Sequence, residues 1–209
     1  MLKKMRLGGV VFASLLTVVS CQNEEMVNNA SQEGQQITIE AVRGLSSRTS
    51  LIPGSVSDTY QTVWSAEDKI YVTSADGRTT GVLTIDPNDA GSPEGTFTGF
   101  VFGNPDDLKY SVFPVPENGV ISLNNVEAGE IDAPMTAEIN PSTNMATFTN
   151  ACAMVRLYIT GLSEGDNTVT VSATDIAGTL EPSITSSGIV LNQKNNEDEI
   201  TITGVQNAE

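Results

Sequence analysis

The sequence predicts an all-β protein, and three observations lead to this prediction. After residue 35, short runs rich in Val, Ile, Thr, Tyr and Phe alternate between apolar and polar residues, as strands do. Clusters of Gly, Pro, Asn and Asp separate the runs as turns. No window of helical length repeats apolar residues at intervals of three and four. Closely spaced strands of this kind favour a β-sandwich over a parallel α/β sheet.

The expected strands follow one another from the residue 36 region almost to the end of the sequence. In chain order they are residues 36–42, 70–73, 81–85, 95–102, 110–113, 120–123, 145–149, 154–160, 168–173, 188–191 and 199–203. Among them we expect a core that contains Phe97, Val112, Phe148, Val155 and Leu157, because each has apolar partners two positions away or turns on both sides.

The residues that form these strands are numerous enough for one β-sandwich with its own core. A domain of about 150 residues buries about 70% of the surface of its unfolded chain, which provides a sizeable core. We expect an N-terminal β-sandwich over residues 36–161, ending where Gly, Ser, Glu and Asp gather at 161–167. Residues 162–209 then add strands that either complete this sandwich or begin a truncated second β domain.

The N-terminus is typical of a secreted protein. Lys3, Lys4 and Arg6 precede an uncharged apolar run over residues 7–19, which is the pattern of a signal peptide over residues 1–20. A membrane-spanning anchor is the alternative, but a spanning helix needs about 20 apolar residues and this run is shorter.

The residues at the expected cleavage point resemble the lipobox of bacterial lipoproteins: Val18, Val19, Ser20 and Cys21. The resemblance implies that Cys21 carries a lipid and anchors the mature chain in the outer membrane. The polar, acidic stretch Gln22-Asn23-Glu24-Glu25 resembles the signal that sends some lipoproteins to the outer face of the outer membrane. Residues 21–35 are rich in Asn, Gln, Glu and Ser, which indicates a flexible tether.

Charge and composition exclude several functions. The formal net charge is −16, and removal of the signal peptide would leave seven cations and 26 acids, a charge of −19. Nucleic acid is therefore not expected as a partner. The chain has no histidine, so it contains no Ser-His-Asp triad, Cys-His nucleophile or His-ligated zinc site. No pair of acids is isolated in an apolar setting, and we expect no enzymatic activity.

No metal or cofactor is predicted. Asp86, Asn88 and Gly91 occupy the first, third and sixth positions of a calcium loop, but Ala90 and Phe97 stand where further ligands belong. An Asx turn in a hairpin loop is the better interpretation.

For two further residues, Cys152 and Trp64, a structural interpretation is preferred. Cys152 lies in an apolar stretch, so a buried structural thiol is expected. Trp64 is the one tryptophan, and a core or interface position is expected in preference to a platform for a sugar ring.

The order of several short motifs resembles the fimbrillin-like family. They are Arg48-Thr49, the run from Trp64 to Val72, Gly95-Thr96-Phe97-Thr98-Gly99, the run from Tyr110 to Pro114, Ala133-Pro134-Met135, and the run from Phe148 to Ala153. The members of this family are lipoprotein precursors of surface pili built from transthyretin-like β-sandwiches. The resemblance spans roughly residues 45–157.

The resemblance implies assembly by strand exchange. In the family, a protease cuts after an arginine in the loop that follows the first strand, this strand leaves, and a segment of the next subunit fills the groove. Residues 36–42 would be the departing strand, with Ile37, Ile39 and Ala41 on one face. Arg48 and Arg43 are the candidate cleavage sites, both expected in an accessible loop.

The chain also departs from the family pattern, since the usual second complete sandwich does not follow. We therefore expect it to accept a strand without donating one, as a terminal or anchoring subunit. The expected partners are the outer membrane, other pilus subunits and either a host surface or a glycan. The alternative function is a surface glycan-binding lipoprotein.

Overall fold

The computed structural model describes residues 34–44, 50–53, 60–127, 133–152, 157 and 159–206. All of them belong to one unit, Gln32–Glu209. Strands dominate these residues, and their only helical segments are two single 3-10 turns, η1 (Pro87–Asp89) and η2 (Pro105–Asp107). The all-β prediction is confirmed.

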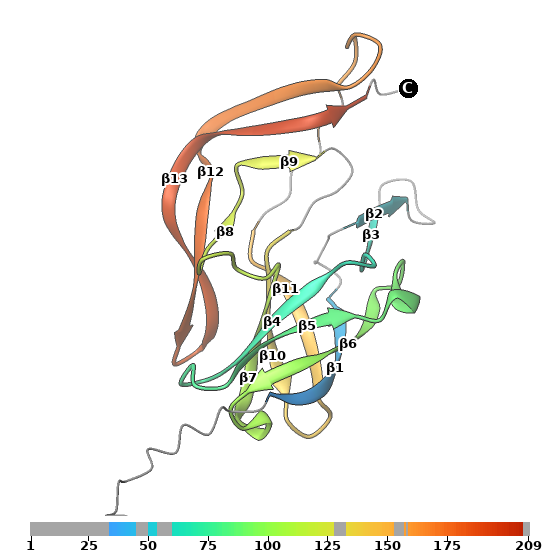
Figure 1. Cartoon of the computed structure of the whole chain (residues 1–209). Coiled ribbons are helices and arrows are strands. Elements are labelled where there is room, and N and C mark those ends of the chain that lie inside the picture. Colours follow the sequence, from blue (N-terminus) through green and yellow to red (C-terminus); the bar gives the residue numbers. More distant parts are fainter. Residues whose placement is uncertain are drawn as a thin grey trace, which may run out of the picture. The chain divides into compact units, whose positions relative to one another are not determined.

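Seven strands close into a barrel in the order β1, β11, β10, β7, β4, β5 and β6 (Figure 1). Their bounds are β1 Gln35–Arg43, β4 Lys69–Ser74, β5 Thr80–Ile85, β6 Glu94–Phe102, β7 Leu108–Phe113, β10 Met135–Asn140 and β11 Met145–Asn150. Neighbouring strands are antiparallel except β1 and β11, which are parallel. The sheet therefore closes on itself, and the expected transthyretin-like sandwich is not confirmed.

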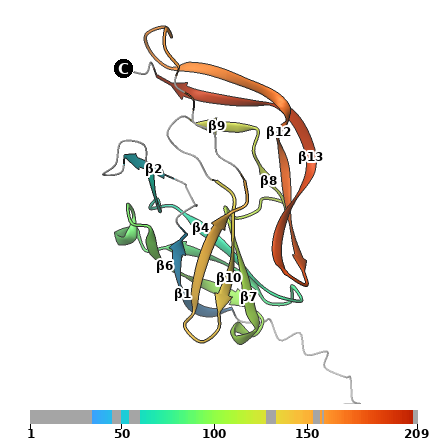
Figure 2. The ribbon, with the colours of Figure 1, turned by 180° about the vertical axis from the view of Figure 1, so that it is seen from behind.

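A second sheet is built around a long C-terminal hairpin of β12 (Asn167–Thr185) and β13 (Gly188–Val205), seen from behind in Figure 2. Its strand order is β8 (Ile121–Ser122), β12, β13 and β9 (Asn125–Glu127). Because β8 and β9 come from the segment between β7 and β10, main-chain pairing joins the C-terminal strands to the earlier part of the chain. A separate two-stranded sheet consists of β2 (Ser50–Pro53) and β3 (Tyr60–Val63).

Alternate side chains of the barrel strands fill its interior. On β10, for example, Met135, Ala137 and Ile139 are buried, while the residues between them are exposed or half-buried. The largest buried side chains inside the barrel are Trp64, Phe97, Phe113 and Phe148. A smaller cluster on the outside of β7 joins Tyr110 and Val112 to Ile121, Leu180 and Ile189.

The predicted core is confirmed at three positions and wrong at one. Phe97 and Phe148 are fully buried inside the barrel, and Val112 is fully buried in the outer cluster. Leu157 is 46% exposed, because the strand expected over residues 154–160 does not form at its described positions 157, 159 and 160. Val155 lies outside the described residues.

The strand predictions also missed or shortened several elements. β10 was not predicted, and β12 and β13 extend far beyond the expected 168–173, 188–191 and 199–203. The polar stretch 195–199, which has the composition of a solvated loop, belongs to β13 and is almost entirely exposed. Main-chain pairing with β12 holds it in a strand although it has no apolar alternation.

Two glycines of β6 are required by close packing. A Cβ atom at Gly95 would lie 2.9 Å from Trp64 Cδ1 and 3.0 Å from Ile85 Cδ1, so a larger residue would displace the indole. A Cβ atom at Gly99 would collide with the carbonyl oxygen of Val82 on β5. The motif from Gly95 to Gly99 thus lets β5 and the tryptophan approach β6 closely.

We predict that Phe148→Ala lowers the free energy of unfolding by about 3 to 5 kcal/mol, because it leaves a cavity in a packed core. Leu157→Ala is the matched control, and its half-exposed side chain should contribute no more than about 0.5 kcal/mol. Urea unfolding followed by tryptophan fluorescence measures both. A loss below about 1 kcal/mol for Phe148→Ala would contradict the packing of this barrel.

Candidate functional site

Strand β1 is the element that the sequence singled out for strand exchange. It is one of the seven strands that form the barrel wall, between β6 and β11. Its residues 35–42 pair with β6, and residues 40–43 pair with β11. Ile39 and Ala41 are buried in the barrel core, and Ile37 packs against that core while partly exposed. The expected common face of these three residues is confirmed.

Arg43 ends β1, and its side chain is completely buried. Its Nη2 atom donates a hydrogen bond to Oδ2 of Asp68 at 3.0 Å. Its guanidinium carbon lies 3.5 Å from the centroid of the Trp64 ring and 5.4 Å from that of Phe113. The expectation that Arg43 lies in an accessible loop is therefore wrong, because the guanidinium finds both a carboxylate and an aromatic face inside the molecule.

Trp64 forms the centre of this cluster. Three phenylalanine rings meet it edge to face, with centroid distances of 4.8 Å for Phe97 and 5.5 Å for Phe113 and Phe148. The main chain fixes the residue as well, since Trp64 N donates to the carbonyl of Ser92 at 2.8 Å. Trp64 is 1% exposed, which confirms the core interpretation and removes it as a sugar platform.

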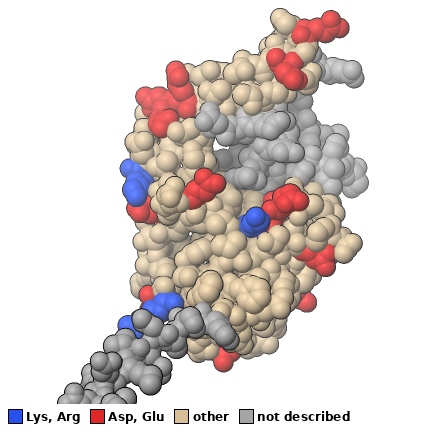
Figure 3. Space-filling view, in the orientation of Figure 1, with Lys and Arg blue, Asp and Glu red and all other residues tan. Residues whose placement is uncertain are grey.

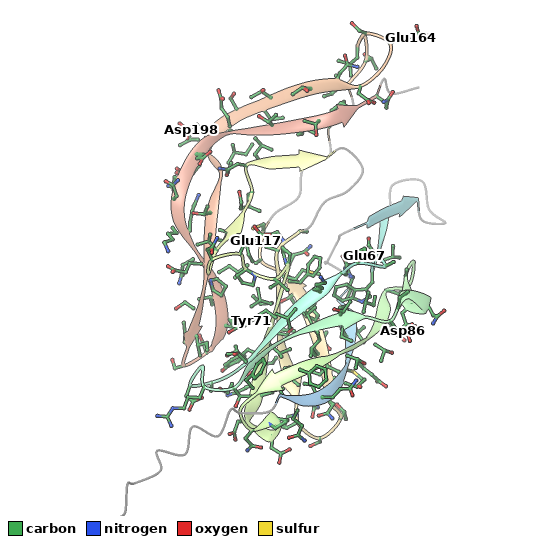
Figure 4. All side chains as sticks on the ribbon, in the orientation of Figure 1. Glu67, Tyr71, Asp86, Glu117, Glu164 and Asp198 are labelled. Carbon is green, nitrogen blue, oxygen red and sulfur yellow. The ribbon has the colours of Figure 1, made fainter. Side chains whose placement is uncertain are left out.

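Asp68 is held by the turn that follows Trp64. Its Oδ2 atom accepts a hydrogen bond from Ser65 N at 2.8 Å, and its own N–H donates to Ser65 O at 3.1 Å. Its carbonyl oxygen accepts from Ile85 N at 3.1 Å, which ties the turn to β5. The neighbouring Glu67, labelled in Figure 4, is exposed. The backbone of this turn thus positions the carboxylate that accepts the hydrogen bond from Arg43.

An exposed aromatic surface lies on the outer face of β4, β5 and β6, and we call it the β5–β6 hollow. Its volume is about 510 Å³, and none of its lining residues is charged. Phe100 is 56% exposed, Phe102 52% and Val82 42%. Tyr71, labelled in Figure 4, three threonines and two glycines complete the lining: Thr80, Thr84, Thr98, Gly81 and Gly99. Acidic side chains, by contrast, are scattered over several separate places on the face in Figure 3.

The calcium-loop candidate forms a turn, and Cys152, predicted to be buried, is buried only in part. Asp86 Oδ1 accepts hydrogen bonds from Asn88 N at 3.0 Å and Asn88 Nδ2 at 2.8 Å, which confirms the Asx turn. The described residues contain no cluster of three His, Cys, Asp or Glu that suits a metal ion. Cys152 is half-buried beside the outer cluster, and burial raises the pKa of its thiol.

Two predicted site residues, Cys21 and Arg48, lie outside the described residues. Within the part of the chain that is described, no helix has the length and apolar character to cross a membrane.

Comparison of the chain with known protein families, with curated proteins and with solved structures finds no match in any of the three. The resemblance to the fimbrillin-like family therefore stays a prediction drawn from the order of short motifs.

Proposed function

We propose that this chain is an exported cell-surface lipoprotein that acts as a pilus subunit and assembles by β-strand addition once β1 has been removed. The proposal includes a relationship to the fimbrillin-like family and the transthyretin-like fold of that family. The observation that carries it is the position of β1. The strand comes first among the described strands and pairs with a neighbour on each side.

Loss of β1 would leave a groove suited to another strand. The main-chain groups of β6 over residues 94–101 and of β11 over residues 145–148 would lose their partners. Unpaired strand edges bind extended segments readily, with backbone hydrogen bonds supplying much of the affinity. The places left by Ile39 and Ala41 would select an incoming strand with apolar residues at alternate positions.

The burial of Arg43 supports Arg48 as the processing site. An arginine-specific protease must bind the guanidinium in its own pocket, and that of Arg43 is enclosed between Asp68 and Trp64. The amide of the following residue, Gly44, also donates to Phe148 O at 2.9 Å. Cleavage after Arg48 does not require the guanidinium of Arg43 to leave this arrangement.

The lipid anchor is tested by replacing the acceptor. Cys21→Ser should abolish incorporation of a labelled palmitate analogue, because acyl transfer requires the thiol. Cys152→Ser is the control and should label normally. Labelling that persists in Cys21→Ser would contradict the lipoprotein proposal.

Strand addition is tested with a synthetic peptide that copies residues 35–43. The full chain, with Arg78→Gln and Arg156→Gln so that the barrel is not cut elsewhere, is cut with an arginine-specific protease, and β1 is exchanged for excess labelled peptide in urea below the unfolding midpoint. The cut protein should retain the peptide on a sizing column, whereas the uncut protein should not. The same peptide with Ile39→Asp should bind at least about tenfold more weakly, because a carboxylate would enter the apolar core.

Two results would contradict strand addition: a chain that stays intact at Arg48, or a cut chain that refuses the peptide. Self-assembly of the cut chain into long polymers would show instead that it can also donate a strand.

A second function, glycan binding, is favoured by the β5–β6 hollow. Aromatic rings stack on the apolar faces of sugars, and the threonine hydroxyls around them are able to hydrogen-bond to sugar hydroxyls. An uncharged lining in a strongly acidic protein suits a neutral polysaccharide.

The double variant Phe100→Ala/Phe102→Ala tests this function by electrophoresis through gels that contain neutral polysaccharides. The wild-type protein should be retarded by at least one of them, and the variant should migrate freely. Leu157→Ala removes a similarly exposed apolar side chain elsewhere and should bind normally. Equal migration of all three proteins in every gel would exclude the glycan function at this surface.

A further inference from the structure

The pair Arg43–Asp68 differs from the other ion pairs that the structure describes. Its two side chains are 0% and 9% exposed, whereas the pairs Arg78–Asp76 and Lys194–Glu181 have side chains that are 50 to 88% exposed. An exposed pair contributes little, but a buried charge that loses its partner is strongly unfavourable. Separating Arg43 from Asp68 therefore has a large cost in this setting.

The contacts of Arg43 fix one end of β1 on several sides. Its side chain reaches Asp68 and Trp64, and its N–H donates to Pro93 O at 3.0 Å, just before β6. The next residue is bound to β11 through Phe148 O. At the other end of β1, Gln35 and Gln36 are exposed and add nothing to the core. The C-terminal end of β1 is thus held by side-chain and main-chain contacts, whereas Gln35 and Gln36 at its N-terminal end are held by main-chain pairing with β6.

We propose that Arg43 is a latch that keeps β1 in the barrel and that its burial also shields the Arg43–Gly44 bond from arginine-specific proteases. For β1 to leave, the guanidinium must come out from between Asp68 and Trp64, and the carboxylate must lose its buried partner. While the latch is closed, the group that such a protease recognises is out of reach. The protection of this bond therefore reports whether β1 is docked.

The latch deepens the proposed strand exchange, and its biological use rests on that function. The latch means that cutting the chain beyond Arg43 does not by itself release β1. A further step has to separate Arg43 from Asp68 and Trp64. Displacement by an incoming strand that enters at the N-terminal end of β1 would be such a step. The latch itself is a property of the uncut chain and is tested there.

The first test measures cleavage at Arg43 in the full chain, with Arg48→Gln, Arg78→Gln and Arg156→Gln in every protein so that this bond is read separately. Arg43–Gly44 should resist an arginine-specific protease, as followed by mass spectrometry. Adding Asp68→Asn should accelerate its cleavage at least about tenfold, because β1 opens more often once the buried ion pair is lost. Adding Glu67→Gln, an exposed change in the same turn, should leave the rate unaltered.

The second test separates a latch from a general loss of stability. Hydrogen exchange at the amides of Ile37 to Val42 should become at least about tenfold faster with Asp68→Asn, whereas exchange in the β4–β5 pair should stay as it was. Arg43→Lys, which keeps the charge but loses the planar fork, should show the same pattern and serves if Asp68→Asn fails to fold.

Two results would overturn the latch. One is cleavage at Arg43 that is equally fast with and without Asp68. The other is exchange that rises equally in β1 and in β4–β5. Neither depends on peptide binding, so failure of the latch and failure of strand addition give different results.

Discussion

The stacking of the Arg43 guanidinium on Trp64 is the interaction on which most of this structure depends. Arg43 closes β1, and Trp64 follows β3 and contacts phenylalanines from β6, β7 and β11. A guanidinium is planar and weakly hydrated, so it can lie on an indole face while one nitrogen reaches a carboxylate. A lysine ammonium is a compact, strongly hydrated charge and lacks both properties. The arrangement joins strands that are far apart in the sequence at one end of the barrel.

The same interaction helps to retain β1, and the rest of the barrel is compatible with the proposed removal of this strand. As a nine-residue strand it contributes only Ile37, Ile39 and Ala41 to the core, so the remaining six barrel strands keep most of the apolar contacts among themselves. Its hydrogen bonds to two neighbours and its buried terminal cation nevertheless hold it in place. An element with few core side chains and one strong anchor is well suited to exchange, because a competing strand can replace the hydrogen bonds progressively before the anchor yields.

The sequence predicted those parts of the fold in which burial alternates along a strand. Residues 36–42, 81–85 and 95–102 were found because apolar and polar residues alternate there, and Trp64 was recognised as a core residue. β10 also alternates, with Met135, Ala137 and Ile139 inward, but its Ala, Glu and Asn residues weaken the strand signal. The polar half of β13 could not be found, because its pairing with β12 leaves it exposed and so without a pattern.

The buried role of Arg43 had no signal in the sequence. A cation before Gly-Leu-Ser-Ser is typical of an exposed loop, since arginine is almost never fully buried unless it is paired. Its partner, Asp68, is 25 positions away and its aromatic platform 21 positions away. Only closure of the barrel brings them together. The sequence therefore identified β1 as a strand but placed Arg43, the last residue of that strand, in a loop.

Strand β6 connects the two functions considered for this protein. Its inward side chains Phe97 and Val101 belong to the core that β1 covers, and its outward side chains Phe100 and Phe102 form the β5–β6 hollow. A Cβ atom at Gly34, directly before β1, would lie 3.2 Å from Phe100 Cβ, so the start of β1 is in close contact with the hollow. Removal of β1 would uncover the side of Phe100 next to Gly34 and turn β6 into a sheet edge. A ligand bound in the hollow would therefore be sensitive to whether β1 is docked, so the two proposed functions would be coupled through this one strand.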